Sequence, residues 1–202
     1  MPSLMTFGPL RIAYADDTLR PRPWTEQQSA WARELLAAAP AGPVLELCSG
    51  VGHIGLLAIL GTGRRLVCVD SSPSACDYAR RNASAAGLGE VVEVRTGAME
   101  EVVAPHERYA LVIADPPWVP SDRTDHYAED PVDSIDGGAD GLDIARTCVR
   151  LADRHLLEGG QVLLQLGDSG QVDALAQELA DLDVREVREG EGGVLALLGR
   201  RA

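Results

Sequence analysis

Short apolar runs alternate along this chain with longer stretches in which apolar residues recur at helical spacing. The runs typical of buried strands lie at 44–47, 65–70, 91–94, 109–113, 161–166, 184–187 and 194–198. The stretches typical of helices lie at 25–36, 54–60, 73–86, 142–157 and 172–182. This alternation predicts an α/β fold with a seven-stranded, mostly parallel sheet, helices on both faces and the last two strands as an antiparallel hairpin.

Residues typical of helix N-termini indicate where the helices begin. Thr25 is placed to cap the first helix, and Ser71 or Ser72 followed by Pro73 is placed to begin the second crossover helix. We expect residues 1–40 to form a leader and a helix that pack on a core domain of residues 41–202. The polar stretch 119–138 interrupts the pattern and is expected to be a loop.

Polar residues and a glycine follow four of the expected strands. Glu46, Asp70, Gly97 and Asp115 all fall at or near the carboxyl ends of apolar runs. In open α/β sheets, ligands bind at that edge. We therefore expect these four residues to belong to one site.

The segment Asp115-Pro116-Pro117-Trp118 comes directly after the fourth apolar run. An Asp at a strand end offers acceptor oxygens to an amide or amino N–H, the two prolines remove backbone donors, and Trp118 supplies an aromatic face. The segment is therefore a candidate site for a planar nitrogen. The alternative is a rigid turn with Trp118 in the core.

A glycine-rich turn follows the first apolar run, and Asp70 lies about twenty residues further on, where a ribose-binding acid stands in nucleotide-binding βαβ units. Such a turn lets a ligand approach the backbone closely. Gly50, Gly52 and Gly55 also satisfy the G-x-G-x-x-G pattern of dinucleotide sites, so a nicotinamide cofactor is an alternative ligand for this turn.

Charge and composition restrict the classes of partner. The chain has 202 residues, a formal net charge of −13 and no lysine. Such an acidic balance disfavours nucleic-acid binding, which usually needs a basic patch. The four cysteines show no C-x-x-C spacing and indicate free thiols. With no signal peptide and no apolar run of membrane length, the expected location is the cytoplasm and no membrane partner is expected.

The remaining polar residues suggest no metal site. The histidines lack metal-ligand spacing, and His53 is expected to cap a helix or to be exposed. The acids of the 119–138 stretch do not follow the order of a calcium-binding loop and are interpreted as an acidic lid that admits substrate and excludes water. Arg123, Tyr127 and Arg146 are candidates for substrate contact there.

Glu46 before the glycine turn and the D-P-P-W segment together resemble the class I, Rossmann-like, S-adenosylmethionine-dependent methyltransferases. The resemblance implies S-adenosyl-L-methionine as the cofactor and places a carboxylate at the position of Glu46 near its methionine amino group. It also makes residues 41–202 the cofactor-binding catalytic domain. The implied cofactor residues are Glu46, Cys48, Gly50, Gly52, Asp70, Ser71, Gly97, Ala98, Met99 and Asp115.

Among these implied cofactor residues, Gly50 and Gly52 would let the backbone approach the aminoacyl part of S-adenosyl-L-methionine. Asp70 would bond the ribose hydroxyls, with Ser71 next to it near the adenine. The segment 96–99 lacks the acid that many such enzymes place against the adenine amine, so backbone atoms at Ala98 would make that contact. Met99 either packs against the adenine ring or belongs to the core.

A narrower resemblance is carried by D-P-P-W together with the run Gly137-Gly138-Ala139-Asp140-Gly141-Leu142. This arrangement is similar to the segment after the N-P-P-Y motif of the HemK-type release-factor glutamine N5-methyltransferases. The leader segment 19–26, L-R-P-R-P-W-T-E, is similar to that family's L-x-P-R-P-E-T-E, and the fifth strand is also similar. The resemblance covers roughly residues 8–167. It implies N-methylation of a planar amide or amine nitrogen, with Asp115, Pro116, Pro117 and Trp118 as the catalytic residues.

This sequence departs from the family at four points. Asp115 replaces its Asn, Trp118 replaces its Tyr, and Trp24 replaces a Glu of its leader motif. We also expect no counterpart of its helical substrate-docking domain before this region. Asn both donates and accepts hydrogen bonds, whereas an ionised Asp only accepts. An acceptor still suits the N–H groups of a glutamine amide, and it would suit an exocyclic amine equally.

Several substrate hypotheses therefore stay open. The first is a protein substrate with a release-factor-like glutamine loop, with a small-molecule amide or amine as a variant. D-P-P-W also resembles the motif of N6-adenine methyltransferases, which the net charge opposes, and a noncatalytic cofactor-binding subunit is the third hypothesis. The sequence does not indicate whether an activating partner is needed.

Overall fold

A seven-stranded sheet forms the centre of the protein in the computed structural model, which describes residues 2–201. The strand order is β5-β4-β3-β6-β7-β9-β8. The first five strands in this order run parallel, and β9 is antiparallel to both β7 and β8. The strands are β3 (Val44–Leu47), β4 (Leu66–Asp70), β5 (Val92–Thr96), β6 (Tyr109–Ala114), β7 (Leu156–Leu166), β8 (Leu182–Gly190) and β9 (Gly193–Arg200). The predicted fold class, including the C-terminal antiparallel hairpin, is confirmed.

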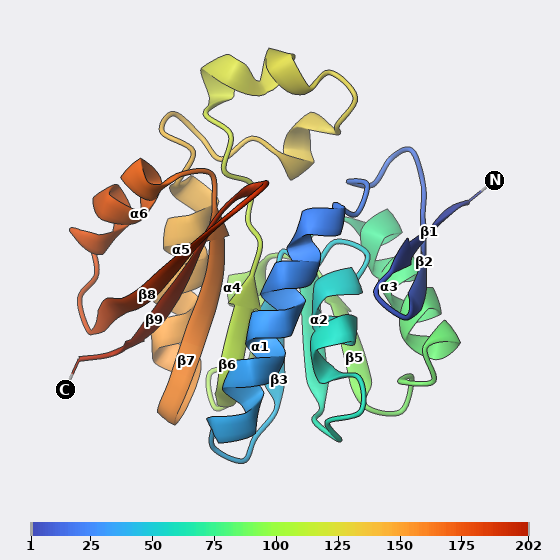
Figure 1. The fold of residues 1–202 in the computed structure, drawn as a ribbon, viewed down its shortest axis with the longest axis horizontal. Coiled ribbons are helices and arrows are strands. Elements are labelled where there is room, and N and C mark those ends of the chain that lie inside the picture. Colours follow the sequence, from blue (N-terminus) through green and yellow to red (C-terminus); the bar gives the residue numbers. More distant parts are fainter. Residues whose placement is uncertain (1, 202) are drawn as a thin grey trace.

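Helices cover both faces of this sheet (Figure 1). One face carries α1 (Glu26–Ala38), α2 (His53–Ile59) and α3 (Pro73–Ala85). The opposite face carries α4 (Met99–Val102), α5 (Asp143–His155) and α6 (Ser169–Ala176). The structure thus has three layers, and the central strands are buried on both sides.

Strand β6 shows why apolar runs mark these strands. Leu111 and Ile113 point into the layer of α1 and α2, whereas Val112 and Ala114 point into the layer of α5. Because side chains alternate between the two faces of a strand, a strand covered on both faces needs apolar residues at every position. All six residues of β6 are buried.

The N-terminal leader contains secondary structure that the sequence analysis does not predict. It forms a separate two-stranded hairpin, β1 (Ser3–Phe7) and β2 (Leu10–Tyr14). Phe7 and Ile12 are buried in the core on the α1 face. Asn82 of α3 holds the second strand through two hydrogen bonds, to the backbone N–H and C=O of Ala13, at 2.8 and 3.0 Å. The leader is therefore an ordered part of the fold.

Three predicted helix boundaries also need correction. Helix α5 ends at His155, and β7 begins at the next residue instead of at 161. Helix α6 spans only Ser169–Ala176, because the chain from Leu182 onward pairs with β9 at the edge of the sheet. Thr25 precedes α1, but its hydroxyl donates to the carbonyl of Arg22 instead of capping the helix. Ser72, in contrast, caps α3 through the N–H of Ala75.

Residues 119–138, here called the projecting segment, extend beyond the carboxyl edge of the sheet (Figure 1, top). The segment contains two 3₁₀ helices, η2 (Ser121–Tyr127) and η3 (Val132–Ser134), and a parallel bridge between Val119 and Asp136 closes its base. An ion pair between Arg22 and Asp130 ties it to the chain before α1. None of the helices in the described part of the chain is long and apolar enough to cross a membrane.

Candidate functional site

Glu46, Asp70, Gly97 and Asp115 lie at the same edge of the sheet, as predicted. Their strands, β5, β4, β3 and β6, are consecutive neighbours. In this parallel register Leu47 pairs with Ala114, and Asp70 pairs with Thr96. The carboxyl ends of the strands therefore bring three carboxylates and a glycine turn together.

Glu46 is a buried carboxylate beneath the glycine turn. It accepts the backbone N–H of Gly55 at 2.9 Å and the thiol of Cys68 at 3.3 Å. Burial raises the pKa of Glu46 to about 7, and the nearby carboxylates of Asp115 and Asp70 contribute to this rise. A methyl group on Gly55 would lie 2.3 Å from a Glu46 oxygen, so only glycine fits there. Gly55 thus leaves room for the Glu46 carboxylate and donates a hydrogen bond to it.

Replacing Glu46 by glutamine is expected to stabilise the protein in the absence of ligand, by an amount that grows as the pH rises from 4.5 to about 7. The pKa of Glu46 is about 7 in the folded protein and 4.5 for a freely solvated side chain, so the folded state binds the proton more tightly. The stability that this proton contributes is full below pH 4.5 and is lost as the pH rises through 7. Glu46→Gln should raise the free energy of unfolding by about 3 kcal/mol at pH 8. Urea denaturation at about pH 8 and about pH 4.5 measures this, and an equal gain at both pH values would contradict it.

Asp70 fixes the glycine turn that precedes α2. Its two carboxylate oxygens accept the backbone N–H groups of Gly50, at 2.7 Å, and Ser72, at 2.9 Å. Burial raises the pKa of Asp70, and these backbone hydrogen bonds oppose that shift. Gly50 and Gly52 adopt the left-handed φ values of 52° and 82°, which only glycine adopts without strain. Asp70 therefore has a structural role, and its contact with a ribose stays a prediction.

The other predicted cofactor residues border this turn. Cys48 precedes it with a φ of 54°, an uncommon value for a residue with a side chain. Its sulfur lies 3.9 Å from that of Cys148 on α5, which in turn lies 3.9 Å from the sulfur of Met99. Met99 thus packs at least partly against the core. Ser71 and Ala98 are both exposed, each directly after or near a strand end.

Asp115 follows β6 and has no partner of opposite charge. In residues 2–201, no side chain or backbone group forms a hydrogen bond or ion pair with its carboxylate. The residue keeps some exposed surface, yet the surrounding protein withdraws its carboxylate from water and raises its pKa to about 7. Glu46, Asp70 and Asp115 therefore form a group of carboxylates without a cation of the described chain beside them.

The glycines of the G-G-A-D-G-L run hold the D-P-P-W backbone at close range. A methyl group on Gly137 would lie 2.7 Å from the Pro117 carbonyl oxygen, and one on Gly141 would lie 2.3 Å from that of Trp118. Gln171 of α6 completes this support by donating to the Trp118 carbonyl at 2.9 Å. The run therefore acts as a backbone cradle for the segment that follows β6.

Gly141→Ala is expected to destabilise the protein far more than Gly159→Ala. Both glycines have left-handed φ values, 77° and 74°, but a methyl group on Gly159 would meet nothing within 4 Å. The matched control thus carries only the backbone strain, about 1 kcal/mol, whereas Gly141→Ala adds a clash with Trp118 and should cost about 3 kcal/mol or more. Urea denaturation of both variants measures the difference, and equal losses would show that the close approach is unimportant.

Trp118 is half-buried and faces the projecting segment. The ring of Tyr127 packs edge-on against it, with 6.4 Å between centroids. A cavity of about 410 Å³ opens beside this pair, lined also by Arg123 and His126. Two of the predicted substrate-contact residues, Arg123 and Tyr127, thus lie beside the site. The third, Arg146, is bound by Asp140, Asp143 and Glu178, and its contact with a substrate stays a prediction.

Two polar residues lie beneath the site. No role is predicted for the first, Gln28, from the sequence, and the prediction for the second, His53, is wrong. Gln28 of α1 is fully buried and donates to the carbonyl of Ala114, the residue before Asp115, at 3.0 Å. His53 neither caps α2 nor lies exposed: it is buried, packs against Phe7 and contacts the hydroxyl of Thr25 at 3.2 Å. Burial lowers the pKa of His53 to about 3, so its ring is neutral. Both residues support the carboxyl ends of the strands from within.

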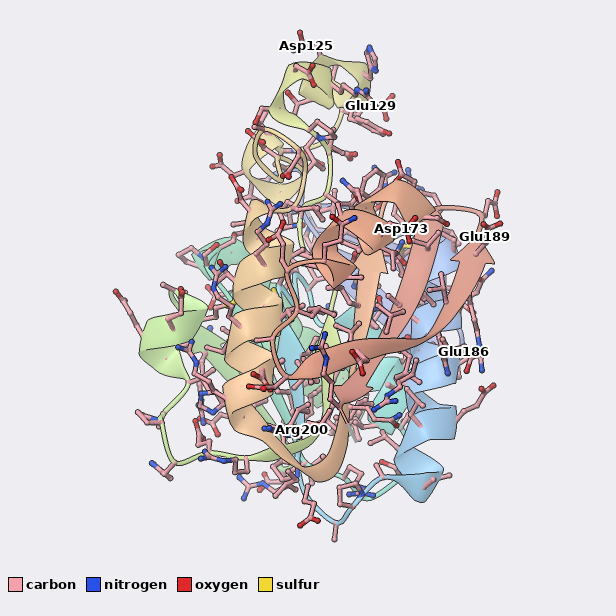
Figure 2. All side chains as sticks on the ribbon, turned by 90° about the vertical axis from the view of Figure 1, so that its left-hand side faces the viewer. Asp125, Glu129, Asp173, Glu186, Glu189 and Arg200 are labelled. Carbon is pink, nitrogen blue, oxygen red and sulfur yellow. The ribbon has the colours of Figure 1, made fainter. Side chains whose placement is uncertain are left out.

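The acidic side chains of the projecting segment do not gather into a metal site. Figure 2 places Asp125 and Glu129 on its outer part, beyond the end of the sheet. Across residues 2–201, no three side chains of His, Cys, Asp or Glu come close enough together to hold a metal ion.

Comparisons with known proteins agree with this geometry. Residues 44–130 match the family model described as a methyltransferase domain. The chain is 32% identical over 171 residues to the release factor glutamine methyltransferase of Mycolicibacterium smegmatis, covering 81% of this chain and 59% of that protein. It is 33% identical over 138 residues to the ribosomal protein uL3 glutamine methyltransferase of Burkholderia pseudomallei, covering 63% and 45%. The chain thus spans less than two thirds of the length of these relatives.

Solved structures share the fold at lower identity. The ribosomal protein L11 methylase of Lactobacillus delbrueckii subsp. bulgaricus superimposes with a TM-score of 0.67 at 17% identity, covering 92% of this chain and 82% of that one. The hMettl16 catalytic domain, solved with the MAT2A 3'UTR hairpin 1, superimposes with a TM-score of 0.75 at 15% identity, covering 94% and 74%. These similarities establish the fold and say nothing of the substrate.

Proposed function

The chain belongs to the class I S-adenosylmethionine-dependent methyltransferases, and from this premise we propose that it methylates the side-chain nitrogen of a glutamine in a protein substrate. The observation that carries the proposal is the unpaired Asp115 carboxylate at the end of β6, next in the chain to the backbone that the G-G-A-D-G-L cradle holds. A hydrogen-bond acceptor at this point suits the two N–H groups of a primary amide.

The charges of the site support S-adenosyl-L-methionine as the cofactor. This molecule carries a positive sulfonium and a positive ammonium group, and the carboxylates of Glu46, Asp70 and Asp115 have no cation of the described chain beside them. Opposite charge nearby favours the ionised form of a carboxylate. A dicationic cofactor head would thus offset the electrostatic cost of grouping these acids.

The same charges oppose the nicotinamide alternative. Dinucleotide cofactors place an anionic pyrophosphate at the N-terminus of the helix after the glycine turn. Here the N–H of Gly55, the third glycine of that pattern, already donates to the Glu46 carboxylate. An acid at this position would repel a pyrophosphate, so the G-x-G-x-x-G match favours no dinucleotide.

The residues proposed to bind the cofactor follow the strand ends. Glu46 would face the methionine amino group, the turn containing Cys48, Gly50 and Gly52 would pass beside the aminoacyl part, and Asp70 would hold the ribose. Asp70 retains acceptor capacity for this purpose, because a carboxylate has about four lone-pair sites and the backbone N–H groups of Gly50 and Ser72 leave some of them free. Ser71, Gly97, Ala98 and Met99 would surround the adenine.

The chain's own residues position the nucleophile in the proposed reaction. S-adenosyl-L-methionine supplies, when bound, a methyl carbon activated by the sulfonium. Asp115 and the carbonyl of Pro116 would accept the amide N–H groups and orient the nitrogen lone pair, which is the main requirement for in-line transfer. Asp115, whose pKa is about 7, can also hold the proton that the nitrogen releases. Trp118 and Pro117 would bound the plane of the amide.

The relatives support a protein substrate. Those that cover most of this chain are named for glutamine in a release factor or in ribosomal protein uL3. The cavity beside Trp118, with Arg123 and Tyr127 in its wall, offers cationic and aromatic contacts to residues next to the glutamine. The net charge of −13 opposes the adenine alternative in nucleic acid. A protein substrate of this kind would place the enzyme in the cytoplasm.

Isothermal titration with S-adenosyl-L-methionine and, separately, with NAD tests the cofactor assignment. We expect saturable binding of S-adenosyl-L-methionine, its loss in Asp70→Ala, and no binding of NAD. The exposed acid Asp173 of α6 provides the control Asp173→Ala, which removes one negative charge away from the site (Figure 2). Binding of NAD alone would overturn the proposed function.

A further inference from the structure

A second cavity lies at the opposite edge of the sheet, where the parallel strands begin. Its volume is about 720 Å³, within the range of small-molecule sites, roughly 300–1,000 Å³. Pro43, Arg65 and Tyr109 stand at or just before the first residues of β3, β4 and β6 and line it. The cofactor residues proposed above lie at the other ends of these same strands, so this cavity is separate from the methyl-transfer site.

Arginines predominate among its charged residues. Arg64, Arg65, Arg95 and Arg108 line the cavity against two acids, Glu93 and Glu107. The local charge is therefore positive in a protein whose net charge is −13. Although the overall field repels anions, a locally positive cavity favours an anionic occupant.

The arginines differ in how far the protein already uses them. Arg64 donates to four backbone carbonyls around the end of α1, and Arg95 pairs with Glu93 at 2.8 Å and with both oxygens of Glu107 at 2.7 Å. Arg95 thus pairs with both acids, and the four arginines against two acids leave the cavity with a net positive charge. Within residues 2–201, the guanidinium of Arg65 forms no hydrogen bond or ion pair.

A buried hydroxyl in the wall also lacks a partner. The side chain of Tyr109 is 1% exposed, and its hydroxyl forms no hydrogen bond in the described part of the chain. An unsatisfied buried hydroxyl is costly, and in native proteins it usually has a partner, a water or a ligand. Burial and, after it, the charge of the neighbouring Glu107 carboxylate raise the pKa of Tyr109 to about 12, so the hydroxyl is a hydrogen-bond donor at neutral pH.

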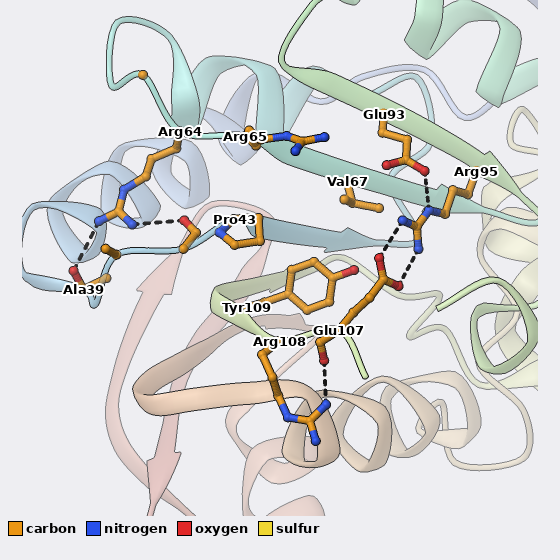
Figure 3. A pocket seen from close by; sticks show the side chains of 13 residues that line it. Ala39, Pro43, Arg64, Arg65, Val67, Glu93, Arg95, Glu107, Arg108 and Tyr109 are labelled. Carbon is orange, nitrogen blue, oxygen red and sulfur yellow. Dashed lines mark hydrogen bonds and ion pairs between the residues drawn. The ribbon is translucent and has the colours of Figure 1, made fainter. Parts of the chain in front are cut away.

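Apolar surface lies between the free groups. Figure 3 shows Pro43, Val67 and the ring of Tyr109 between the side chains of Arg65 and Arg108. Arg108 uses one nitrogen to donate to the carbonyls of Pro105 and Glu107, which leaves its other N–H groups available. The cavity thus combines an apolar wall with donors and positive charge.

We propose that this cavity is a second ligand site, which binds a small organic anion with an apolar or aromatic body and a carboxylate or phosphate group. The apolar body would lie against Pro43, Val67 and the Tyr109 ring. The anionic group would accept hydrogen bonds from Arg65 and from the Tyr109 hydroxyl, so that both unsatisfied groups gain partners. A carboxylate and a phosphate can both be bound in this way, since each offers oxygens to a planar guanidinium.

Isothermal titration of the full chain with phenyl phosphate, and in a second arm with phenylacetate, tests this site. Excess S-adenosylhomocysteine is present throughout to fill the cofactor site. We expect one saturable site in the wild type, and the tighter of the two probes identifies the headgroup. Inorganic phosphate, which lacks the apolar body, and benzyl alcohol, which lacks the charge, should bind much more weakly.

The decisive variants are Arg65→Gln and its matched control Arg150→Gln. Both residues are exposed, and Arg150 lies on α5 outside the cavity. Arg65→Gln should weaken probe binding by about tenfold or more, Tyr109→Phe by a few-fold, and Arg150→Gln should leave it unchanged. Equal binding in all variants, or no saturable binding of either probe to the wild type, would overturn the proposal. Because the cofactor site is filled, neither result bears on the methyltransferase assignment.

Discussion

Asp115→Ala is expected to lower the rate of methyl transfer by about 10²–10³-fold, the usual effect of removing one preorganised polar group at the reacting atoms. The affinity for S-adenosyl-L-methionine should fall by about tenfold at most, because the variant removes only one of three nearby acids. The physical reason is that Asp115 has no partner in the described chain, so its carboxylate is free to bind the acceptor nitrogen. Turnover and titration calorimetry on the same preparation measure both quantities.

Asp115→Asn is the matched control, because it keeps the shape and one acceptor oxygen while removing the charge. If Asp115 orients the nitrogen by accepting its N–H bonds, the Asn variant should retain much more activity than the Ala variant. If it acts chiefly by holding the released proton, both variants should be equally inactive. Loss of cofactor binding in Asp115→Ala would instead make it a cofactor residue and contradict the role proposed here.

The affinity for S-adenosyl-L-methionine is expected to rise with pH through neutrality. Burial raises the pKa values of Glu46 and Asp115 to about 7, so both carboxylates are partly protonated in the free protein at that pH. A cationic ligand favours the ionised forms, so binding releases protons. Below about pH 7 the affinity should therefore fall by about tenfold per pH unit for each proton released, and above about pH 8 it should level off.

S-adenosylhomocysteine provides the matched ligand, since it keeps the ammonium group but lacks the sulfonium charge. Its affinity should depend less on pH than that of S-adenosyl-L-methionine, and Glu46→Gln should reduce the dependence for both. Titration calorimetry at pH values from about 5.5 to about 8.5, in buffers of different ionisation enthalpy, reports the protons released. A pH-independent affinity would show that these carboxylates do not face the positive charges of the cofactor.

The central strands of the sheet could be predicted from sequence because they are covered on both faces. A strand such as β6 must be apolar at every position, which makes it visible as an unbroken run. The hairpin β1–β2 carries a different signal, since only alternate residues such as Met5, Phe7, Leu10 and Ile12 point inward. That alternation, with Gly8 at its turn, is present in the sequence but is weaker than an unbroken apolar run, so the hairpin escapes prediction.

The location of the site could likewise be predicted, because strand ends in a parallel sheet meet at one edge. The residues that support it could not. Gln28 and Gln171 lie on helices and bond backbone carbonyls far away in the chain, those of Ala114 and Trp118. Nothing in the sequence around either glutamine indicates such a partner. The three ion pairs of Arg146 likewise join residues that no sequence motif connects, those with Asp140, Asp143 and Glu178.

Methyl transfer to an intact release factor is the most direct test of the proposed activity. The protein is incubated with S-adenosyl-L-methionine and either a release factor carrying a Gly-Gly-Gln loop or an adenine-containing oligonucleotide, and the products are analysed by fragment mass spectrometry. We expect one added methyl group on the glutamine side-chain nitrogen, no transfer to adenine, and initial product formation lowered by about 10²–10³-fold with Asp115→Ala. Methylation of adenine, or cofactor binding without transfer to any protein glutamine, would contradict the proposed function.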